Sequence, residues 1–231
     1  MFRQLADRIL RGELPAGGAL PAERELSEAL GVNRGAVREA IKRLQQAGLV
    51  AVRQGGNSLV LDYMAEGGLE LLPNLLLQAD GRVNATVVRS IMAMRSSLAP
   101  DIAAAAARKG GQRLADELDA LLAQMEGGKA GLRTLQPAAH AYWKLLVERG
   151  GNIAYRLAFN SMSKTYLQVQ DALAQVLEPE FRDYANFAAM AAAVRRGDTD
   201  AARSAGLRHV EIGRRALDAA LDQLEARGGK P

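Results

Sequence analysis

The 231-residue chain lacks cysteine entirely, has only two histidines, and is only 4% aromatic. Without cysteine it forms no disulfide and offers no thiolate, and a reducing cytoplasm is the expected location. No apolar run approaches membrane-spanning length, and the amphipathic N-terminus lacks the apolar core of a signal peptide. The sequence also lacks GxSxG, a glycine-rich loop between a strand and a helix, and any cluster of acids and histidines at ligand spacing. These absences argue against an enzyme.

The chain is rich in apolar residues, at 48%, and carries a small positive charge of +4. The apolar share supports a substantial core, and the length allows one large domain or two of ordinary size, of which the boundary signals along the chain favour two. The basic excess fits a nucleic-acid partner but is too small to prove one. The distribution of charge is therefore more informative than its sum.

One stretch, residues 20–62, is typical of two short helices followed by a β-hairpin. A first helix precedes it at residues 2–11, and Gly31 makes the turn between the two helices. Asn33 is a good N-cap for the last helix, and Gly48 a plausible stop. The expected strands are residues 49–53 and 58–62, joined by Gln54-Gly55-Gly56-Asn57. This order predicts a winged helix-turn-helix.

The expected helix from Asn33 to Ala47 is apolar on one side and cationic on the other when its residues are laid out at 3.6 per turn. The apolar arc contains Ala36, Val37, Ala40, Ile41 and Leu44, and the opposite arc contains Arg34, Arg38, Lys42, Arg43 and Gln45. Such a helix is suited to a DNA major groove lined with phosphates. The stretch therefore predicts a DNA-binding domain.

After Tyr63 only helical periods remain, broken by glycine, proline or capping pairs. The expected helices are residues 67–79 with a bend at Pro73, 84–108 with a kink at Pro100, 112–125, 132–149, 152–177, 179–196 and 199–226. The predicted fold is mainly α, with an N-terminal winged helix-turn-helix carrying a small hairpin and a C-terminal all-α antiparallel bundle. The expected domains are residues 1–63, a linker helix at 64–80, and 81–231.

The run LPAERELSEALGVNRGAVREAIKRLQQAGLV resembles the N-terminal domain of GntR-type bacterial transcription regulators. The rest of the chain resembles the FadR/FCD branch of that family, whose helical domain binds an effector and usually forms the dimer. That looser resemblance rests on GGLELLPNLL, Arg95 within IMAMRSSLAPDIAAAA, GGN at 150–152, and AAAVRRGDTDAARSAGLRHV.

The resemblance implies that the winged domain reads a short palindrome. The residues expected to contact DNA are Arg24, Asn33, Arg34, Gly35, Arg38, Gln54, Gly55 and Gly56. Arg34, at the helix N-terminus, is placed to reach a base edge, whereas Arg24 and Arg38 could contact a base or a phosphate. Gly35 and Gly56 stand where close relatives often carry a hydroxyl or a basic side chain, so the operator sequence does not transfer.

Many FCD proteins hold a divalent metal with one aspartate and three histidines, and the resemblance places those ligands at Ala139, Trp143, Phe187 and His209. Of these four residues only His209 has a side chain that binds metals, so no bound metal and no cofactor are expected. The aromatic replacements resemble the FadR type, in which the effector is a long acyl-CoA. The expected effector-binding residues are Arg95, Tyr142, Trp143, Phe187 and His209, with the Arg95 fork as anchor for a carboxylate or phosphate. Aromatic residues at helical spacing are also typical of a plain core.

The sequence therefore predicts a sequence-specific transcriptional regulator whose DNA affinity is modulated by an acyl-CoA or organic acid in the C-terminal domain. Its expected partners are palindromic double-stranded DNA, a small-molecule effector and a second copy of the chain, with no membrane. The alternative is a DNA-binding dimer whose helical domain only dimerises and binds no effector.

Overall fold

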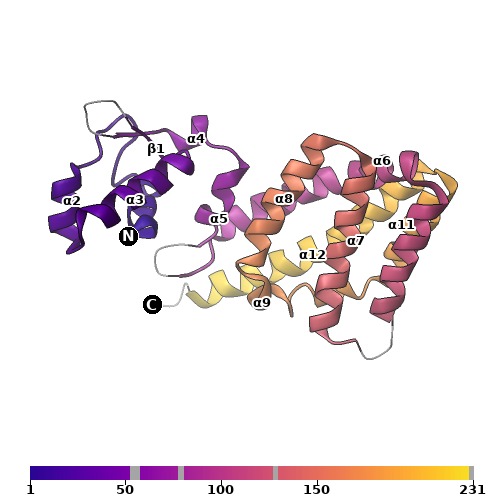
Figure 1. The fold of residues 1–231 in the computed structure, drawn as a ribbon. Helices are drawn as coiled ribbons and strands as arrows, with labels where there is room; N and C mark the ends of the chain where they lie inside the picture. The colour runs from indigo at the N-terminus through magenta and orange to yellow at the C-terminus, as the bar shows by residue number, and fades with distance from the viewer. Residues whose placement is uncertain (53–57, 78–80, 127–129, 229–231) are drawn as a thin grey trace. The chain divides into compact units, whose positions relative to one another are not determined.

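The computed structural model describes residues 1–52, 58–77, 81–126 and 130–228. The chain forms two compact units, Met1–Asn84 and Ala85–Pro231. Figure 1 shows a small helical unit with a hairpin at the N-terminus and an all-helical unit after it. The predicted fold class is confirmed. The finer division at residues 63 and 80 stays a prediction.

The first unit begins with three helices, α1 (Phe2–Leu10), α2 (Glu23–Leu30) and α3 (Arg34–Gln46). Helix α2 ends at Gly31, whose φ of 62° is a left-handed conformation that favours glycine. Helix α3 begins after Asn33, whose side chain accepts a hydrogen bond from the Ala36 amide at 2.8 Å. That bond satisfies an amide that has no partner within the helix. The predicted cap and turn are confirmed.

The hairpin consists of β1 (Val50–Ala51) and β2 (Leu59–Val60), which pair antiparallel with Val50 opposite Val60. Both strands are shorter than predicted. Ala19 also bridges to Leu59, so the segment before α2 borders the hairpin. The residues that join the strands, 53–57, lie outside the described residues.

The core of the first unit draws side chains from all of these elements. Leu5, Leu20, Leu44 and Leu49 are at most 1% exposed, and they belong to one apolar cluster that also contains Val37. Full burial of such a side chain contributes about 1.5–3 kcal/mol. The apolar arc of α3 is thus held in this core, which leaves its opposite arc exposed.

The segment after the hairpin differs from the single helix predicted for residues 67–79. It forms α4 (Tyr63–Glu66), a 3-10 turn η1 (Leu69–Leu71) and α5 (Leu72–Leu75). Asp62 caps α4 through the Met64 amide at 3.0 Å. Pro73 lies in the first turn of α5, where the missing amide hydrogen costs nothing. Proline therefore begins a helix here instead of bending one.

The second unit is built on α6 (Ala85–Glu126), which packs against α7 (Leu132–Gly150), α11 (Tyr184–Arg196) and α12 (Thr199–Gly228). These helices form the bundle in Figure 1. The backbone of α6 is non-helical at Gly111, with φ of 59° and ψ of −162°. The break predicted between residues 108 and 112 is therefore confirmed. Within the described residues, no helix combines the length and the hydrophobicity that a membrane span requires.

Small residues allow α6 and α12 to approach closely. A Cβ added at Gly206 would lie 3.1 Å from the Ala103 Cβ, and Ala103 is fully buried. At the corner after α7, a Cβ added at Gly150 would lie 3.3 Å from the Ala105 Cβ. The alanine-rich part of α6 thus serves as a close helix-helix contact surface.

The long helices predicted at 152–177 and 179–196 are each broken. The structure has α8 (Ile153–Leu167), α9 (Gln170–Leu173) and α10 (Glu178–Phe181) before α11. The predicted stop-and-start pairs are confirmed: Gly151 ends α7 and Asn152 caps α8. Gly197 likewise ends α11, with φ of 67°.

An acid-dependent contribution to stability is expected from Glu211 on α12. Arg214 donates hydrogen bonds to its carboxylate and, against partial burial, holds its pKa at about 2 compared with 4.5 ordinarily, with help from the Ser96 hydroxyl. Because the pKa is lowered in the folded state, the stabilisation is complete above pH 4.5 and is lost as the pH falls toward 2. Glu211→Gln should therefore be less stable than the parent near neutral pH, and the difference should shrink on acidification.

Urea unfolding followed by the fluorescence of Trp143, the only tryptophan, measures this difference. Glu148→Gln is a suitable control because its partner, Arg156, is exposed and 3.4 Å away. The control should change stability little at any pH. A pH-independent difference between Glu211→Gln and the parent would contradict the expectation.

Candidate DNA-binding and effector sites

The exposed face of α3 carries cationic and polar side chains over its whole length. We call this the recognition face; its residues are Arg34, Arg38, Lys42 and Gln45, all exposed, whereas the exposed Glu39 and Arg43 lie farther around the helix. The apolar residues Val37, Ala40, Ile41 and Leu44 are buried on the opposite side. A positive helix face anchored from behind by a core is the arrangement that helix-turn-helix proteins insert into a major groove.

The cations of this region differ in how they are paired. Arg38 Nε donates to Glu23 Oε2 at 2.7 Å, so the first residue of α2 holds this arginine. Arg24 lies 3.9 Å from Glu28, and Arg43 lies 3.8 Å from Glu39. By contrast, Arg34 and Lys42 form no ion pair with any residue that the structure describes. These two cations are available to a phosphate or a base without first losing a partner.

The remaining predicted DNA contacts have distinct positions. The Asn33 side chain is used to cap α3, so its oxygen is already bonded. Gly35 is exposed in the first turn of α3, where an added Cβ would lie 3.3 Å from Asn33 Oδ1. The predicted contacts at Gln54, Gly55 and Gly56 lie outside the described residues.

The structure brings four of the five predicted effector residues into one group of rings in the second unit, and the fifth, Arg95, is linked to that group through Glu180. We call this the effector cluster; its residues are Arg95, Tyr142, Trp143, Phe187 and His209. The His209 ring centre lies 4.2 Å from that of Phe187 and 5.9 Å from that of Trp143. The Tyr142 ring is 4.6 Å from Phe187, and its hydroxyl donates to the Phe187 carbonyl at 2.7 Å. Burial raises the pKa of Tyr142, so this residue acts as a neutral, satisfied core group.

Arg95 is engaged by a carboxylate that the sequence had not indicated. Its guanidinium forms two hydrogen bonds with Glu180 of α10, one of them at 2.7 Å to Oε2. The Glu180 side chain is only 4% exposed, and that of Arg95 is 24% exposed. Burial lowers the pKa of Arg95, but the Glu180 carboxylate more than offsets this and leaves that pKa above its usual value. Arg95 therefore keeps its positive charge, which the negative charge of Glu180 balances.

His209 is fully buried, and its ring meets carboxylates on both sides. Its Nδ1 lies 2.9 Å from Asp183 Oδ2, and its Nε2 lies 3.6 Å from Glu180 Oε1, beyond hydrogen-bond range. Burial raises the pKa of Asp183, but the hydrogen bonds from His209 and Asn186 outweigh this and leave it lowered. The Nε2 atom of His209 and the indole Nε1 of Trp143 are buried without a hydrogen-bond partner in the described part of the chain.

Two unpartnered ring nitrogens in one aromatic cluster are notable because buried polar groups are normally hydrogen-bonded. An indole N–H only donates, so it needs an acceptor oxygen. A ligand oxygen placed beside Trp143 would satisfy it. The cluster therefore contains two buried ring nitrogens with unused hydrogen-bonding capacity.

Four positions of this chain align with the metal ligands of FCD proteins in the sequence analysis, and the side chains at these positions do not suit a metal. Ala139 and Phe187 carry no ligand atom, and the indole nitrogen of Trp143 is a donor only. In the ranges that the structure describes, no group of three or more histidine, cysteine or carboxylate side chains could hold an ion. That the protein binds no metal stays a prediction.

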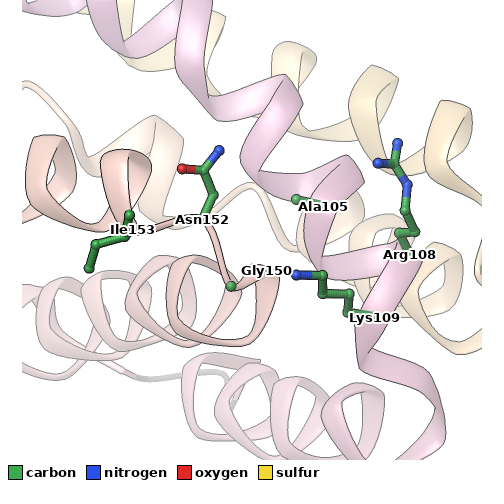
Figure 2. A pocket seen from close by; sticks show the side chains of 7 residues that line it. Ala105, Arg108, Lys109, Gly150, Asn152 and Ile153 are labelled. Carbon is green, nitrogen blue, oxygen red and sulfur yellow. The ribbon is translucent and has the colours of Figure 1, made fainter.

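A separate surface pocket of about 390 Å³ lies at the corner between α7 and α8. Figure 2 shows the Lys109 side chain directed toward Gly150, whereas Arg108 points away from it. Both cations lie in the turn of α6 that precedes the break at Gly111. Cations are favoured at helix C-termini because they face the free carbonyl groups, and this explains their presence without a ligand.

The sequence predicted the members of the effector cluster but missed Glu180 and Asp183. Both are buried or nearly buried acids that face Arg95 and His209 from α10 and the N-cap of α11. The only local sign was an Asp183 side chain placed to cap a helix. Their partners are 85 and 26 residues distant in the chain, so no local pattern shows the pairing.

The winged helix-turn-helix unit with a cationic helix face, followed by an all-helical unit, is the architecture of a class of DNA-binding transcription regulators. Two family models match the chain: bacterial regulatory proteins of the gntR family over residues 1–60 and the FCD domain over residues 90–212. The chain belongs to the GntR family, in the branch that carries an FCD domain.

Relatives agree with this assignment. The chain is 36% identical over 221 residues to the HTH-type transcriptional regulator Mce2R of Mycobacterium tuberculosis (strain CDC 1551 / Oshkosh), covering 96% of this chain and 91% of that protein. It is 35% identical over 99 residues to the fatty acid metabolism regulator protein of Vibrio vulnificus (strain YJ016), covering 42% of this chain and 35% of that protein. The protein is thus a transcriptional regulator and not an enzyme.

Among solved structures, E. coli McbR/YncC has a TM-score of 0.52 at 17% identity, and the match covers 95% of this chain and 96% of that chain. At this identity the likeness concerns the fold alone. It agrees with the order of elements described above.

Proposed function

We propose that two copies of this chain bind a palindromic operator through their α3 helices, and that an effector bound in the second unit modulates this binding. The proposed DNA contacts are Arg24, Asn33, Arg34, Gly35, Arg38 and the wing residues Gln54, Gly55 and Gly56. The proposed effector is an acyl-CoA or organic acid, held by the effector cluster, in the cytoplasm. The observation that carries the proposal is the exposed cationic face of α3, on which Arg34 and Lys42 have no partner in the described chain.

The DNA-binding role is supported by the placement of each cation. Arg34 is the first residue of α3, where helix-turn-helix proteins reach base edges. Lys42 lies two turns further along the same face and suits a phosphate. Arg38 must exchange Glu23 for DNA or contact DNA while Glu23 orients it. A twofold dimer would present two such faces to the two half-sites.

The effector role is supported by the unpartnered nitrogens of Trp143 and His209, the second of which faces the same Glu180 carboxylate that pairs with Arg95. One relative, matched over 42% of this chain, is named a fatty acid metabolism regulator protein, which makes acyl compounds the first ligands to test. Buried aromatic rings together with a partly buried arginine suit a molecule with an apolar chain and an acidic head.

A second candidate is a dimeriser without an effector. It is favoured by Tyr142, whose hydroxyl is satisfied within the core, and by α8, which exposes Ile153 by 70% and Leu157 by 60%. Thermal melting against acyl-CoAs and organic acids separates the two candidates. A selective rise in Tm with one compound supports the sensor, and a flat response to all of them supports the dimeriser.

Binding to the DNA upstream of the protein's own gene should show a salt dependence set by phosphate contacts. Fluorescence anisotropy between about 50 and 200 mM salt should show affinity for a palindrome falling by one or more orders of magnitude. A single half-site of equal length should bind much more weakly, because it engages only one recognition face of a dimer. Equal affinity for the palindrome, the half-site and random duplex would refute sequence-specific binding.

A further inference from the structure

Glu180 occupies the position at Arg95 that an acidic ligand would take. Its carboxylate approaches the planar guanidinium with both oxygens, which is the geometry by which arginine binds carboxylates in general. The same carboxylate faces the unpartnered Nε2 of His209 at 3.6 Å. The anchor for an anion and a carboxylate that fills it are therefore both present in the one chain.

A glycine provides the space for this carboxylate. Gly213 of α12 faces Glu180, and a Cβ built at that position would overlap the Glu180 Oε2 atom. Any side chain at 213 would thus compete with a carboxylate for the same volume. The space beside Arg95 is shaped for a carboxylate group.

The element that carries Glu180 is small. Helix α10 has 4 residues and lies between α9 and α11. The side chain before it and the one that ends it, Leu177 and Phe181, are each 6% exposed. If Glu180 moved away from Arg95, the buried side chains of Leu177 and Phe181 at the two ends of α10 would have to repack. A local movement of Glu180 would thus change contacts within the bundle.

We propose that Glu180 is a built-in occupant of a carboxylate subsite at Arg95, and that an effector carboxylate binds by exchanging with it. The inference rests on the proposed function, since it assigns the acidic head of the effector to this subsite. The exchange replaces one carboxylate with another, so Arg95 keeps an anionic partner throughout. Glu180, once displaced, regains solvation that it lacks when buried. A neutral ligand would offer Arg95 no such replacement.

The test is chemical rescue with acetate, which reproduces the Glu180 carboxylate as a free ion. Glu180→Ala removes the occupant and leaves Arg95 unpaired beside an empty space. Sodium acetate at about ten times its Kd should raise the Tm of this variant by about 3–6 °C over sodium chloride at equal ionic strength. The parent protein should show no such difference, because acetate lacks the apolar chain of the proposed effector and competes poorly with a carboxylate held in the same chain.

Glu178→Ala is the matched control, because Glu178 lies on the same helix but pairs with the exposed Arg182 at 2.7 Å. Its Tm in sodium acetate should equal its Tm in sodium chloride, as expected for the parent. The double variant Glu180→Ala/Gly213→Ala should lose the acetate response, because the new methyl group occupies the place of the carboxylate. Should Glu180→Ala fail to fold, Glu180→Ser also removes the carboxylate, leaves the space beside Arg95 open and should respond to acetate.

The proposal is overturned if neither Glu180 variant gains more from acetate than the parent does, or if the double variant responds as Glu180→Ala does. Its failure is distinguishable from that of the proposed function. Operator binding is measured without acetate, and a metabolite that shifts the Tm of the parent would establish a sensor even if acetate rescue were absent. Conversely, acetate rescue without any metabolite response would support Glu180 as the occupant of a carboxylate subsite but would refute its exchange with an effector.

Discussion

Replacing Arg34 by alanine is expected to weaken operator binding about 5- to 150-fold, equivalent to about 1–3 kcal/mol, while binding to random duplex changes much less. The reason is its position: Arg34 opens α3, is exposed, and forms no ion pair with the described residues. A bidentate contact to a guanine would be lost only on the operator. The ratio of operator to random affinity, measured at one salt concentration, checks this.

Arg43→Ala is the control for this variant. Arg43 is on the same helix and also exposed, but it pairs with Glu39 and lies farther around the helix. It should leave the affinity ratio nearly unchanged and only slightly reduce binding to both duplexes. If Arg34→Ala kept the parent's ratio, α3 would not read bases through this residue.

Replacing Arg95 by methionine is expected to lower the free energy of unfolding by about 3–5 kcal/mol. The variant leaves the Glu180 carboxylate, which is 4% exposed, buried without a partner. Adding Glu180→Leu to Arg95→Met should recover most of the loss, because apolar residues can replace a buried ion pair at little cost. Urea unfolding followed by Trp143 fluorescence measures all three proteins.

Arg182→Met serves as the control for the Arg95 variant. It removes the exposed pair with Glu178 on the same short helix and should change stability little, because solvent screens such pairs. A double variant no more stable than Arg95→Met would show that the loss arises from packing around Arg95 and not from an unpaired charge.

Local signals explain which elements the sequence predicted well. Helix α3 was predicted with its N-cap because the apolar period and the Asn33 side chain act within a few residues of each other. The corners at Gly151 and Gly197 were also predicted, since a left-handed glycine followed by a capping side chain is a local device. In each case the residues that decide the structure are neighbours in the chain.

Helix length was predicted poorly where composition permits a helix everywhere. Residues 152–177 were expected as one helix, yet α8 ends at Leu167 and α9 begins at Gln170. Between them, Val169 has φ of −128° and is 9% exposed, so its packing into the core coincides with the interruption. Propensity is a weak prior that such tertiary contacts override.

The sequence by itself determined the class of protein, because the motif from Leu20 to Leu49 combines a core-forming period, a cap and a cationic face within about thirty residues. Only the tertiary structure decided that Arg95 is already paired, that His209 lies between Asp183 and Glu180, and that Gly213 makes room for a carboxylate. The physical reason is that buried charged groups pair across the bundle with residues of other helices, far away in the chain. The hydrophobic periodicity of a single helix gives no information about such pairs.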